Sequence, residues 1–348
     1  MITLDRALGE HGAAWDDLHG KLFRSNPLLD SRFIDALLRH FGTGSERLCV
    51  LREGNETLAM CIVQPSNPTV WATFLPSQAQ IAPVLIGDPK VVPGLFNILP
   101  QAVLKLDLLA NDPGFGDLSE IDNSKQGPSD HALAMSIAVV GSFDAYWETR
   151  TGRLQDDIAR NERQIVDDHR QMRLERVNEP EHLAGAIARH GRLAACDWRG
   201  AAGTATADGS GQDTFYLDLL TRFAATSGAA IYEMWIDNQL AASRLVIFAN
   251  QTLAILKTTS DDSLSRYAPG NLLLKRLLQD AFSHYPGGTV ELYSNSNGDD
   301  LAWATHQRRL RHVSCYRQSR TSHISSSVRT NYRPVTTPVA NLRYANLL

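Results

Sequence analysis

The sequence predicts an α+β fold of mixed α/β content, with mostly antiparallel strands and flanking helices in both halves of the chain. The 348 residues are 43% hydrophobic, which is enough for the cores of two domains. Towards the C-terminus, three apolar segments separated by short polar turns predict an antiparallel meander, which an amphipathic helix follows. Towards the N-terminus, two short helical segments precede an apolar hairpin. Each half therefore supplies the strands and helices of its own domain.

The N-terminal half begins with helices. Apolar periodicity predicts one over residues 13–24, and Asp30 or Ser31 caps a second helix that ends at residue 41. A hairpin over residues 47–65 follows. Further strands are expected at 69–75, 81–86, 104–109 and 131–140, a short helix at 91–100, and an exposed polar loop at 116–130.

Ser142 caps a helix that a charged segment extends to about Met172. Its interleaved arginines and carboxylates are typical of a solvated helix face, and a phosphate-gripping role is the alternative. Helices are expected at 180–190 and 214–227, with a Gly/Ala/Thr-rich loop at 201–212 between them. Beyond residue 288 the pattern predicts a strand at 289–293, a loop at 295–300, a short helix at 301–306 and a strand at 310–316.

The clearest local pattern lies between residues 231 and 285. The meander strands are expected at 231–236, 240–249 and 252–259, and the helix at 271–285. Just before this helix, the run Arg266-Tyr267-Ala268-Pro269-Gly270-Asn271 puts Pro and Gly where the first turn presents unpaired N–H groups. This loop is either an anion site or only a turn into the helix.

The same stretch resembles the GNAT acyltransferases, and specifically their two-domain CelD-like branch, which is related to the FemAB transferases. A strand carrying Lys257, an acidic pair at Asp261-Asp262, and Arg266-Tyr-x-Pro-Gly before an apolar helix carry the resemblance. The Arg-to-Gly spacing is one residue longer than in the general GNAT loop, and Asn271 replaces its final small residue. The Tyr-x-Pro-Gly form is usual in the CelD-like branch. The N-terminal Asn-Pro-Leu-Leu segment with Phe33 extends the resemblance.

The resemblance implies tandem GNAT-like domains, each built on a mostly antiparallel twisted sheet. Residues 1–140 are expected to form a degenerate GNAT-like domain, residues 141–173 a connecting charged helix, and residues 174–317 a GNAT domain with an acyl-CoA site. Residues 318–348 form a basic tail, interpreted as disordered or loosely attached, with a specific binding arm as the alternative.

The implied substrate is acetyl-CoA or another acyl-CoA, and the implied mechanism is direct transfer without a covalent enzyme intermediate. Backbone amides of the loop would wrap the pyrophosphate, and a backbone amide near residues 256–258 would stabilise the oxyanion. The residues expected to bind coenzyme A are Leu256, Lys257, Thr258, Arg266, Ala268, Pro269, Gly270, Asn271, Leu272 and Lys275.

The candidate catalytic residues are Glu233, Lys257, Asp261 and Tyr267. Glu233 lies where many GNAT enzymes activate an amine through water, or it is a half-exposed strand carboxylate. Asp261 follows the lysine strand and otherwise caps a turn. Tyr267 protonates the leaving thiolate or stacks on the ligand. Lys257 is expected at the cleft, because burying an unpaired ammonium is costly.

Trp198 and Arg199 precede the Gly-rich loop and are expected to line the acceptor pocket; a core Trp with a solvated Arg is the alternative. Related proteins carry a Gly-x-x-x-Tyr-Lys motif near the end of the domain. Here Gly298 is present, but Leu301 and Ala302 replace the Tyr-Lys pair, while Trp303 persists.

Charge and cysteine content limit the function classes. The first 300 residues carry a net charge of −12, and the remainder carries +8 on eight arginines without any Asp or Glu. The four cysteines show neither zinc-ligand spacing nor a disulfide framework, so no metal is expected and a reducing compartment fits. Without a signal sequence or an apolar spanning segment, the sequence indicates a cytoplasmic protein.

The leading hypothesis is an acyl-CoA-dependent N- or O-acyltransferase that acts on a small-molecule, sugar, polysaccharide or envelope-precursor acceptor. A FemAB-like transferase that uses aminoacyl-tRNA is the alternative, and only under it is nucleic acid a partner; the basic tail favours it and the acidic body opposes it. A third hypothesis is a non-catalytic GNAT-like partner of a polysaccharide or secretion system, which the missing Tyr-Lys pair supports.

Overall fold

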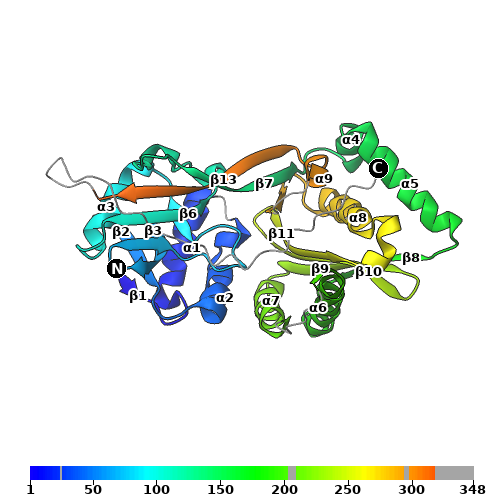
Figure 1. Ribbon diagram of the computed structural model, residues 1–348, viewed down its shortest axis with the longest axis horizontal. Coiled ribbons are helices and arrows are strands. Elements are labelled where there is room, and N and C mark those ends of the chain that lie inside the picture. Colours follow the sequence, from blue (N-terminus) through cyan, green and yellow to red (C-terminus); the bar gives the residue numbers. More distant parts are fainter. Residues whose placement is uncertain (24–25, 203–208, 294–297, 318–348) are drawn as a thin grey trace.

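The strands of both halves join into one continuous sheet (Figure 1). The structure, a computed structural model, describes residues 1–23, 26–202, 209–293 and 298–317, and within them the side chains of all but 196–202, 209–211 and 298–299. The predicted α+β class is confirmed, since a mostly antiparallel sheet is covered by helices on both faces. The two expected sheets meet edge to edge instead of standing apart.

The N-terminal half contains β1 (Ile2–Thr3), η1 (Gly9–His11), α1 (Gly12–Phe23), η2 (Pro27–Leu29), α2 (Ser31–Phe41), β2 (Arg47–Glu53), β3 (Glu56–Asn67), β4 (Val70–Thr73), β5 (Val84–Ile86), η3 (Pro89–Val91), α3 (Val92–Ile98), β6 (Lys105–Asn111), η4 (Pro113–Phe115), η5 (Ser119–Ile121) and β7 (Ser129–Ala138), where η marks a 3-10 helix.

The C-terminal half contains α4 (Phe143–Glu148), α5 (Gly152–Asp167), β8 (Met172–Val177), α6 (Pro180–Ala202), α7 (Gly209–Ala224), β9 (Ala229–Ile236), β10 (Gln239–Ala249), β11 (Thr252–Ser260), η6 (Asp262–Tyr267), α8 (Pro269–His284), β12 (Thr289–Leu292), α9 (Gly298–Leu301) and β13 (His306–Tyr316).

The two halves exchange strands at their junction. The order across the sheet is β1-β2-β3-β4-β6-β13-β7-β12-β11-β10-β9-β8, with β5 on the side of β3. Strand β7 of the first half pairs with β12 of the second, β13 of the second pairs with β6 of the first, and β7 and β13 pair with each other. In Figure 1 the orange β13 runs beside β7 and onto the N-terminal half. Each half therefore completes its sheet with a strand from the other.

Helices cover the sheet in layers. One apolar core joins α1, α2, α6 and α7 to one face, and α2 packs against α7. A second core packs α4, α5 and α8 on the opposite face of the C-terminal strands, and a third packs α3 on the N-terminal strands. Figure 1 shows α6 and α7 below the C-terminal strands and α8 above them. The C-terminal strands are thus buried on both faces.

The meander and the helix after it are confirmed. Strands β9, β10 and β11 pair antiparallel in sequence order. The second turn has positive φ at both Asn250 and Gln251, which matches the twist of a two-residue hairpin. In α8 the predicted apolar stripe is buried; for example, Leu274 and Leu278 are fully covered. The caps at Asp30 and Ser142 also form, since their side chains accept from the Arg32 and Ala145 amides at 3.0 and 3.1 Å.

Several predicted boundaries were wrong. The expected loop at 201–212 is shorter, because α6 continues to Ala202 and α7 starts at Gly209. Alanines favour helix strongly, and they follow Gly200 at the end of α6. The expected connecting helix is two helices, α4 and α5, because Thr151 caps a new one through the Leu154 amide at 3.3 Å. Strand β8 was missed, and β13 starts at residue 306 and not at 310. The domain boundaries stay a prediction.

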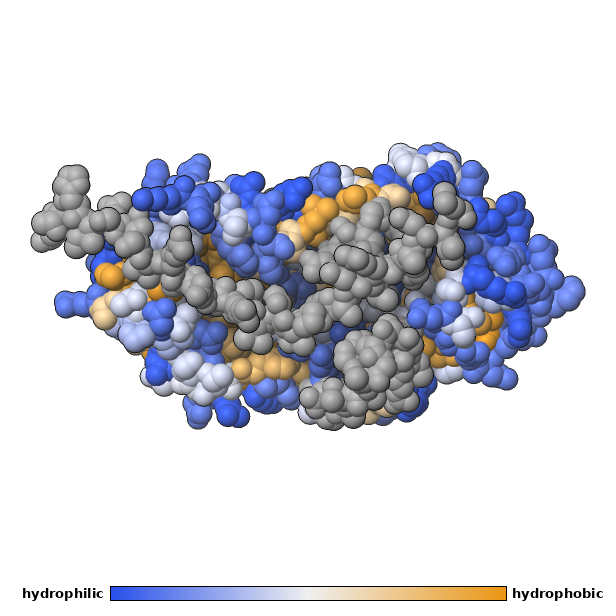
Figure 2. Space-filling model, in the orientation of Figure 1, coloured by the Kyte–Doolittle hydropathy of each residue, from blue (hydrophilic) through white to orange (hydrophobic). Residues whose placement is uncertain are grey.

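The charges of α5 face solvent. Arg160 and Arg153 both pair with Asp157, and all three side chains are more than a third exposed. Figure 2 shows a hydrophilic surface at the end of the molecule that α5 forms in Figure 1. This part of the helix fits the solvated face that the sequence pattern indicates.

Candidate functional site

Strand β11 loses its neighbour halfway along. Its parallel pairing with β12 covers only Thr252 to Ile255. Beyond this point β11 continues beside β10 to Ser260, and the register between these two strands shifts opposite Leu245, as in a β-bulge. The segment Leu256–Thr258 therefore lies where no described strand pairs with its second edge. This open edge is the segment in which a backbone amide was expected to stabilise an oxyanion.

The loop before α8 folds as a tight left-handed entry to the helix. Ala268 has φ 45°, and its carbonyl accepts from the amides of Asn271 and Leu272 at 3.0 and 3.2 Å. These two amides, which were expected on a pyrophosphate, are thus already used within the turn. The Gly270 amide has no such partner among the described residues. It is the N–H that the first turn of α8 leaves for an anion.

The protein itself does not require glycine at position 270. A Cβ there would meet only Ser260, at 3.9 Å, which is an ordinary contact, and the backbone φ is not positive. The space beside this backbone is therefore available to another molecule. Close approach by a phosphate fits that space, because a missing side chain lets the anion reach the amide directly.

A buried arginine lies beside the same turn. Arg244 of β10 donates from Nη2 to the Gly270 carbonyl at 3.2 Å and is only 6% exposed. Its Nε has no hydrogen-bond partner among the described residues. Burial lowers the pKa of Arg244 to about 10, although the nearby Asp300 acts in the opposite direction. This donor and its charge fit a bound diphosphate. Arg244 has no local motif around it that would have identified it from the sequence, because most of its strand is apolar.

The two cations predicted for phosphate binding already have partners. Lys275 contacts both oxygens of Glu162 at 2.9 and 3.1 Å. Arg266 pairs with Asp168 on the surface and also contacts the Tyr267 hydroxyl. A phosphate at either side chain would have to compete with a carboxylate, so Arg244 is the better-placed cation.

Glu233 of β9 and Arg189 of α6 form an ion pair in which the carboxylate is buried and the arginine side chain is 30% exposed. Glu233 is fully buried on β9, and Arg189 binds both of its carboxylate oxygens at 2.9 Å each. A carboxylate held in this bidentate way has its charge neutralised and its lone pairs occupied. The structure therefore places Glu233 in a structural pair and not at a free position on a half-exposed strand.

Asp261 and Tyr267 are also engaged. The Asp261 carboxylate caps η6 by accepting from the Ser263 amide at 2.8 Å, and it receives Gln239 at 2.6 Å. These hydrogen bonds lower the pKa of Asp261 despite its partial burial. The Tyr267 side chain is 1% exposed, and its hydroxyl donates to Asp168 at 2.7 Å. Both residues hold the loop in shape.

Lys257 lies on the open edge of β11. Its ammonium lies 3.3 Å from the Gln212 side-chain oxygen of α7. Burial lowers the pKa of Lys257, and the carboxylate of Asp213 acts against that shift. Thr258, the next residue, is exposed and pairs across the sheet with Arg244. Because successive side chains of a strand point to opposite faces of the sheet, Lys257 points towards α7 and Arg244 points towards α8. The two side chains therefore lie on opposite faces of the sheet at the open edge.

The N-terminal half also reaches this region. Gln80 donates to the Leu256 carbonyl at 3.5 Å, and its own side-chain oxygen is buried without a hydrogen-bond partner within the described ranges. Segment η2 packs against β10 and β11. The site thus lies between the halves, a placement that the local motif around Gly270 does not reveal.

Other predicted positions are placed as follows. The side chains of Trp198 and Arg199 lie outside the described residues, on the last turns of α6. Trp303 is fully buried, and its carbonyl accepts from the Tyr146 hydroxyl at 2.6 Å. Leu301, which replaces the tyrosine of the motif expected from the resemblance, is 41% exposed.

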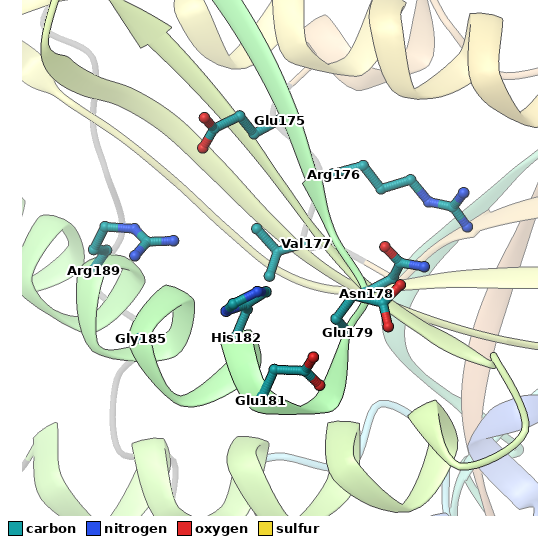
Figure 3. Close-up of a pocket in the computed structure, with 9 residues that line it drawn as sticks. All are labelled: Glu175, Arg176, Val177, Asn178, Glu179, Glu181, His182, Gly185 and Arg189. Atoms are coloured by element: carbon teal, nitrogen blue, oxygen red, sulfur yellow. The ribbon is translucent and has the colours of Figure 1, made fainter.

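A cavity of about 450 Å³ lies elsewhere, between β8 and the start of α6. Figure 3 shows Glu175 projecting from β8 and Arg189 and His182 from α6 around it. This cavity lies at the outer edge strand, far across the sheet from β11 in strand order. Two of its lining residues reach Glu233, since Arg189 binds the carboxylate and Glu175 pairs with Glu233 across the strands. The cavity therefore lies apart from the open edge of β11.

Within the described part of the chain, no group of three or more His, Cys, Asp or Glu residues is arranged to hold a metal ion. A membrane-crossing helix is likewise not found among the described helices, none of which combines the required length and hydropathy.

Part of the chain matches a known protein family. Residues 152–296 match the family model of the acetyltransferase (GNAT) domain, which supports an acyltransferase of the GNAT superfamily. The match includes β8 to β12, α8 and the loop before it. It does not distinguish the CelD-like branch. No curated protein matches the sequence.

Solved structures share the fold across both halves. FemX is 8% identical with a TM-score of 0.57, over 86% of this chain and 95% of its own. The C-terminal DUF2156 domain of a protein from Agrobacterium fabrum is 11% identical with a TM-score of 0.53, over 88% and 93%. A protein of unknown function from Bacteroides thetaiotaomicron is 12% identical with a TM-score of 0.53, over 88% and 97%. At these identities the likeness shows the fold alone.

Proposed function

We propose that this protein is an acyl-CoA-dependent acyltransferase that passes an acyl group directly to an amine or hydroxyl of a small-molecule, sugar, polysaccharide or envelope-precursor acceptor. One observation carries the proposal: an open edge of β11 lies beside a helix start whose glycine the protein itself does not require. The GNAT-domain match over this region supports the donor class. Coenzyme A thioesters are cytoplasmic metabolites, so the proposal includes a cytoplasmic location.

Different residues contact the diphosphate and the thioester of the donor. The Gly270 amide and the Arg244 guanidinium bind the diphosphate, one through the helix dipole and one through its charge. The open backbone from Leu256 to Thr258 supplies N–H groups for the charge that develops on the thioester oxygen. Acyl-CoA contributes the activated acyl group. The protein binds and orients the donor and stabilises the oxyanion.

Thermal unfolding with coenzyme A and with acetyl-CoA tests the proposal. A ligand present at a hundred times its dissociation constant stabilises the folded state by about 2.7 kcal/mol, so the melting temperature should rise. The Gly270→Asp variant should lose this rise, because a carboxylate would occupy the anion site and repel the diphosphate.

Gly152→Asp is the matched control. Gly152 also lies in the first turn of a helix, with no atom within 4 Å of an added Cβ. An aspartate there should leave the coenzyme A response intact. The proposal is wrong if millimolar coenzyme A does not stabilise the wild-type protein, or if both variants respond to it equally.

A second candidate is aminoacyl transfer from tRNA. The fold shared with FemX over 86% of this chain favours testing it, together with the eight arginines after residue 300. Charged tRNA would bind through phosphates, so its affinity should fall steeply with salt. Tight, salt-sensitive tRNA binding without any stabilisation by coenzyme A would select this candidate. Stabilisation by coenzyme A without transfer to any acceptor would instead indicate the non-catalytic partner protein.

A further inference from the structure

Opposite charges face each other on the α6–α7 side of the open edge. The Lys257 ammonium of β11 lies 3.3 Å from Gln212, and Asp213 is the next residue of α7. Each charge shifts the other: Lys257 opposes the burial that raises the pKa of Asp213, and Asp213 opposes the burial that lowers the pKa of Lys257. No direct ion pair joins the two, in contrast to the closed pair of Arg189 and Glu233.

The position of the Asp213 carboxylate depends on a glycine. A Cβ on Gly191 of α6 would lie 2.6 and 2.9 Å from the two Asp213 oxygens, closer than real Cβ atoms come to their neighbours. Gly185 on the same helix is different, because its Cβ would meet only Arg189, at an ordinary 3.5 Å. The absent side chain at position 191 therefore lets the carboxylate lie against α6.

His190, beside this glycine, adds a neutral wall. Its Nδ1 lies 2.9 Å from the Ser243 hydroxyl, and its Nε2 has no hydrogen-bond partner in the part of the chain that the structure describes, although the residue is 4% exposed. Burial, with a smaller effect of Lys257, lowers the pKa of His190 to about 4. The imidazole is therefore uncharged near neutral pH, and Lys257 is the charged group that acts on Asp213.

The two faces of the open edge suit the two substrates. Arg244 and the Gly270 amide lie on the α8 face, whereas Lys257 and Asp213 lie on the α7 face. A donor that binds on the first face and lies along the open edge presents its thioester to the second. The earlier candidates for proton transfer cannot serve there, because Glu233 and Tyr267 are tied to other side chains.

Resting on the proposed function, we propose that Asp213 is the general base that receives the proton of the acceptor, that Lys257 returns a proton to the leaving sulfur, and that Gly191 positions Asp213. The acceptor N–H or O–H gives its proton to the Asp213 carboxylate as the new bond to the acyl carbon forms. The C–S bond breaks, and the thiolate takes a proton from the Lys257 ammonium. Proton transfer from Asp213 to Lys257 then restores both groups.

Thiol release from acetyl-CoA with a panel of amines and amino sugars tests the base. General base catalysis contributes about 10²- to 10⁴-fold, so Asp213→Asn should lower kcat by a factor of this order. Stabilisation by coenzyme A should be unchanged, and the acidic limb of the pH profile should disappear. Gly191→Ala should also lower kcat although it keeps the carboxylate. Gly185→Ala is the matched control and should retain wild-type kcat.

An amine-reactive reagent gives a readout that needs no acceptor. Lys257 should react at a lower pH than ordinary lysines, and acetyl-CoA should protect it; the Lys257→Met protein identifies the labelled peptide. Wild-type kcat in Asp213→Asn would overturn the assignment, as would acetyl-CoA that stabilises the protein but leaves Lys257 fully reactive. A protein that coenzyme A neither stabilises nor protects would refute the proposed function, and the assignment with it.

Discussion

Replacing Arg189 with methionine should lower the free energy of unfolding more than replacing any exposed charged residue. Glu233 is 0% exposed, and Arg189 supplies both of its hydrogen bonds at 2.9 Å. Without Arg189, the Glu233 carboxylate keeps the desolvation penalty of its burial and loses the ion pair that offsets this penalty. Breaking a buried pair in this way costs about 3–5 kcal/mol, a large share of the 5–15 kcal/mol that typically stabilises a domain.

The cost should depend on pH and on Glu233 itself. A buried carboxylate without a cation is relieved when it takes up a proton, so the Arg189→Met protein should regain stability as the pH falls. The Arg189→Met/Glu233→Met double variant removes both charges and should cost much less than the sum of the single changes. Urea unfolding at pH 7 and pH 5 measures both effects.

Two results would refute this account. An Arg189→Met protein that loses less than about 1 kcal/mol at pH 7 would show that the pair is not closed in solution. A Glu233→Gln protein that keeps normal stability but loses transfer activity would return Glu233 to the role of catalytic base. The expected outcome is the reverse, with reduced stability and retained kcat.

Three further perturbations follow from other contacts. Arg244→Leu should weaken coenzyme A binding at least tenfold, measured by calorimetry, because the Gly270 turn loses its buried cation. Burial lowers the pKa of His312 to about 4. Its contribution to the free energy of unfolding is therefore fully present above about pH 6.5 and is lost as the pH falls towards 4. His312→Gln should flatten this part of the plot of urea stability against pH. Burial raises the pKa of Glu291 to about 7. Its contribution to the free energy of unfolding is therefore lost as the pH rises from about 4.3 through 7. Glu291→Gln should abolish this loss of stability, measured by the same urea unfolding.

Local pattern predicted the elements that carry the donor site. The strands around Lys257 and the helix after Gly270 follow from alternation, turn residues and a 3.6-residue apolar stripe, all of which act over a few residues. The resemblance then assigned a ligand to the loop. What the loop residues do was less accessible, since the amides of Asn271 and Leu272 close the turn onto Ala268 instead of remaining free.

Long-range pairing decided the rest. Nothing near Glu233 in the sequence indicates that Arg189, 44 residues earlier, would neutralise it. Arg244 follows Ser243 in a mostly apolar strand, and its hydrogen bond to the Gly270 carbonyl, 26 residues later, shows that it faces α8. The contact between Asp213 and Gly191 likewise depends on how closely two helices pack. Side-chain partners of this kind come from tertiary structure, which periodicity does not encode.

The exchange of β7 and β13 has a consequence for how this chain is made. On the ribosome, β6 emerges long before β13, its neighbour in the sheet. Residue 135 of β7 likewise emerges 157 residues before its pairing partner, residue 292 of β12. Neither half can close its sheet during synthesis until β12 and β13 have emerged. Pairings so distant in sequence are slow to form. Until then the apolar edges of β6 and β7 stay available to other chains, so protection by chaperones matters more for this fold than for two domains that mature one after the other.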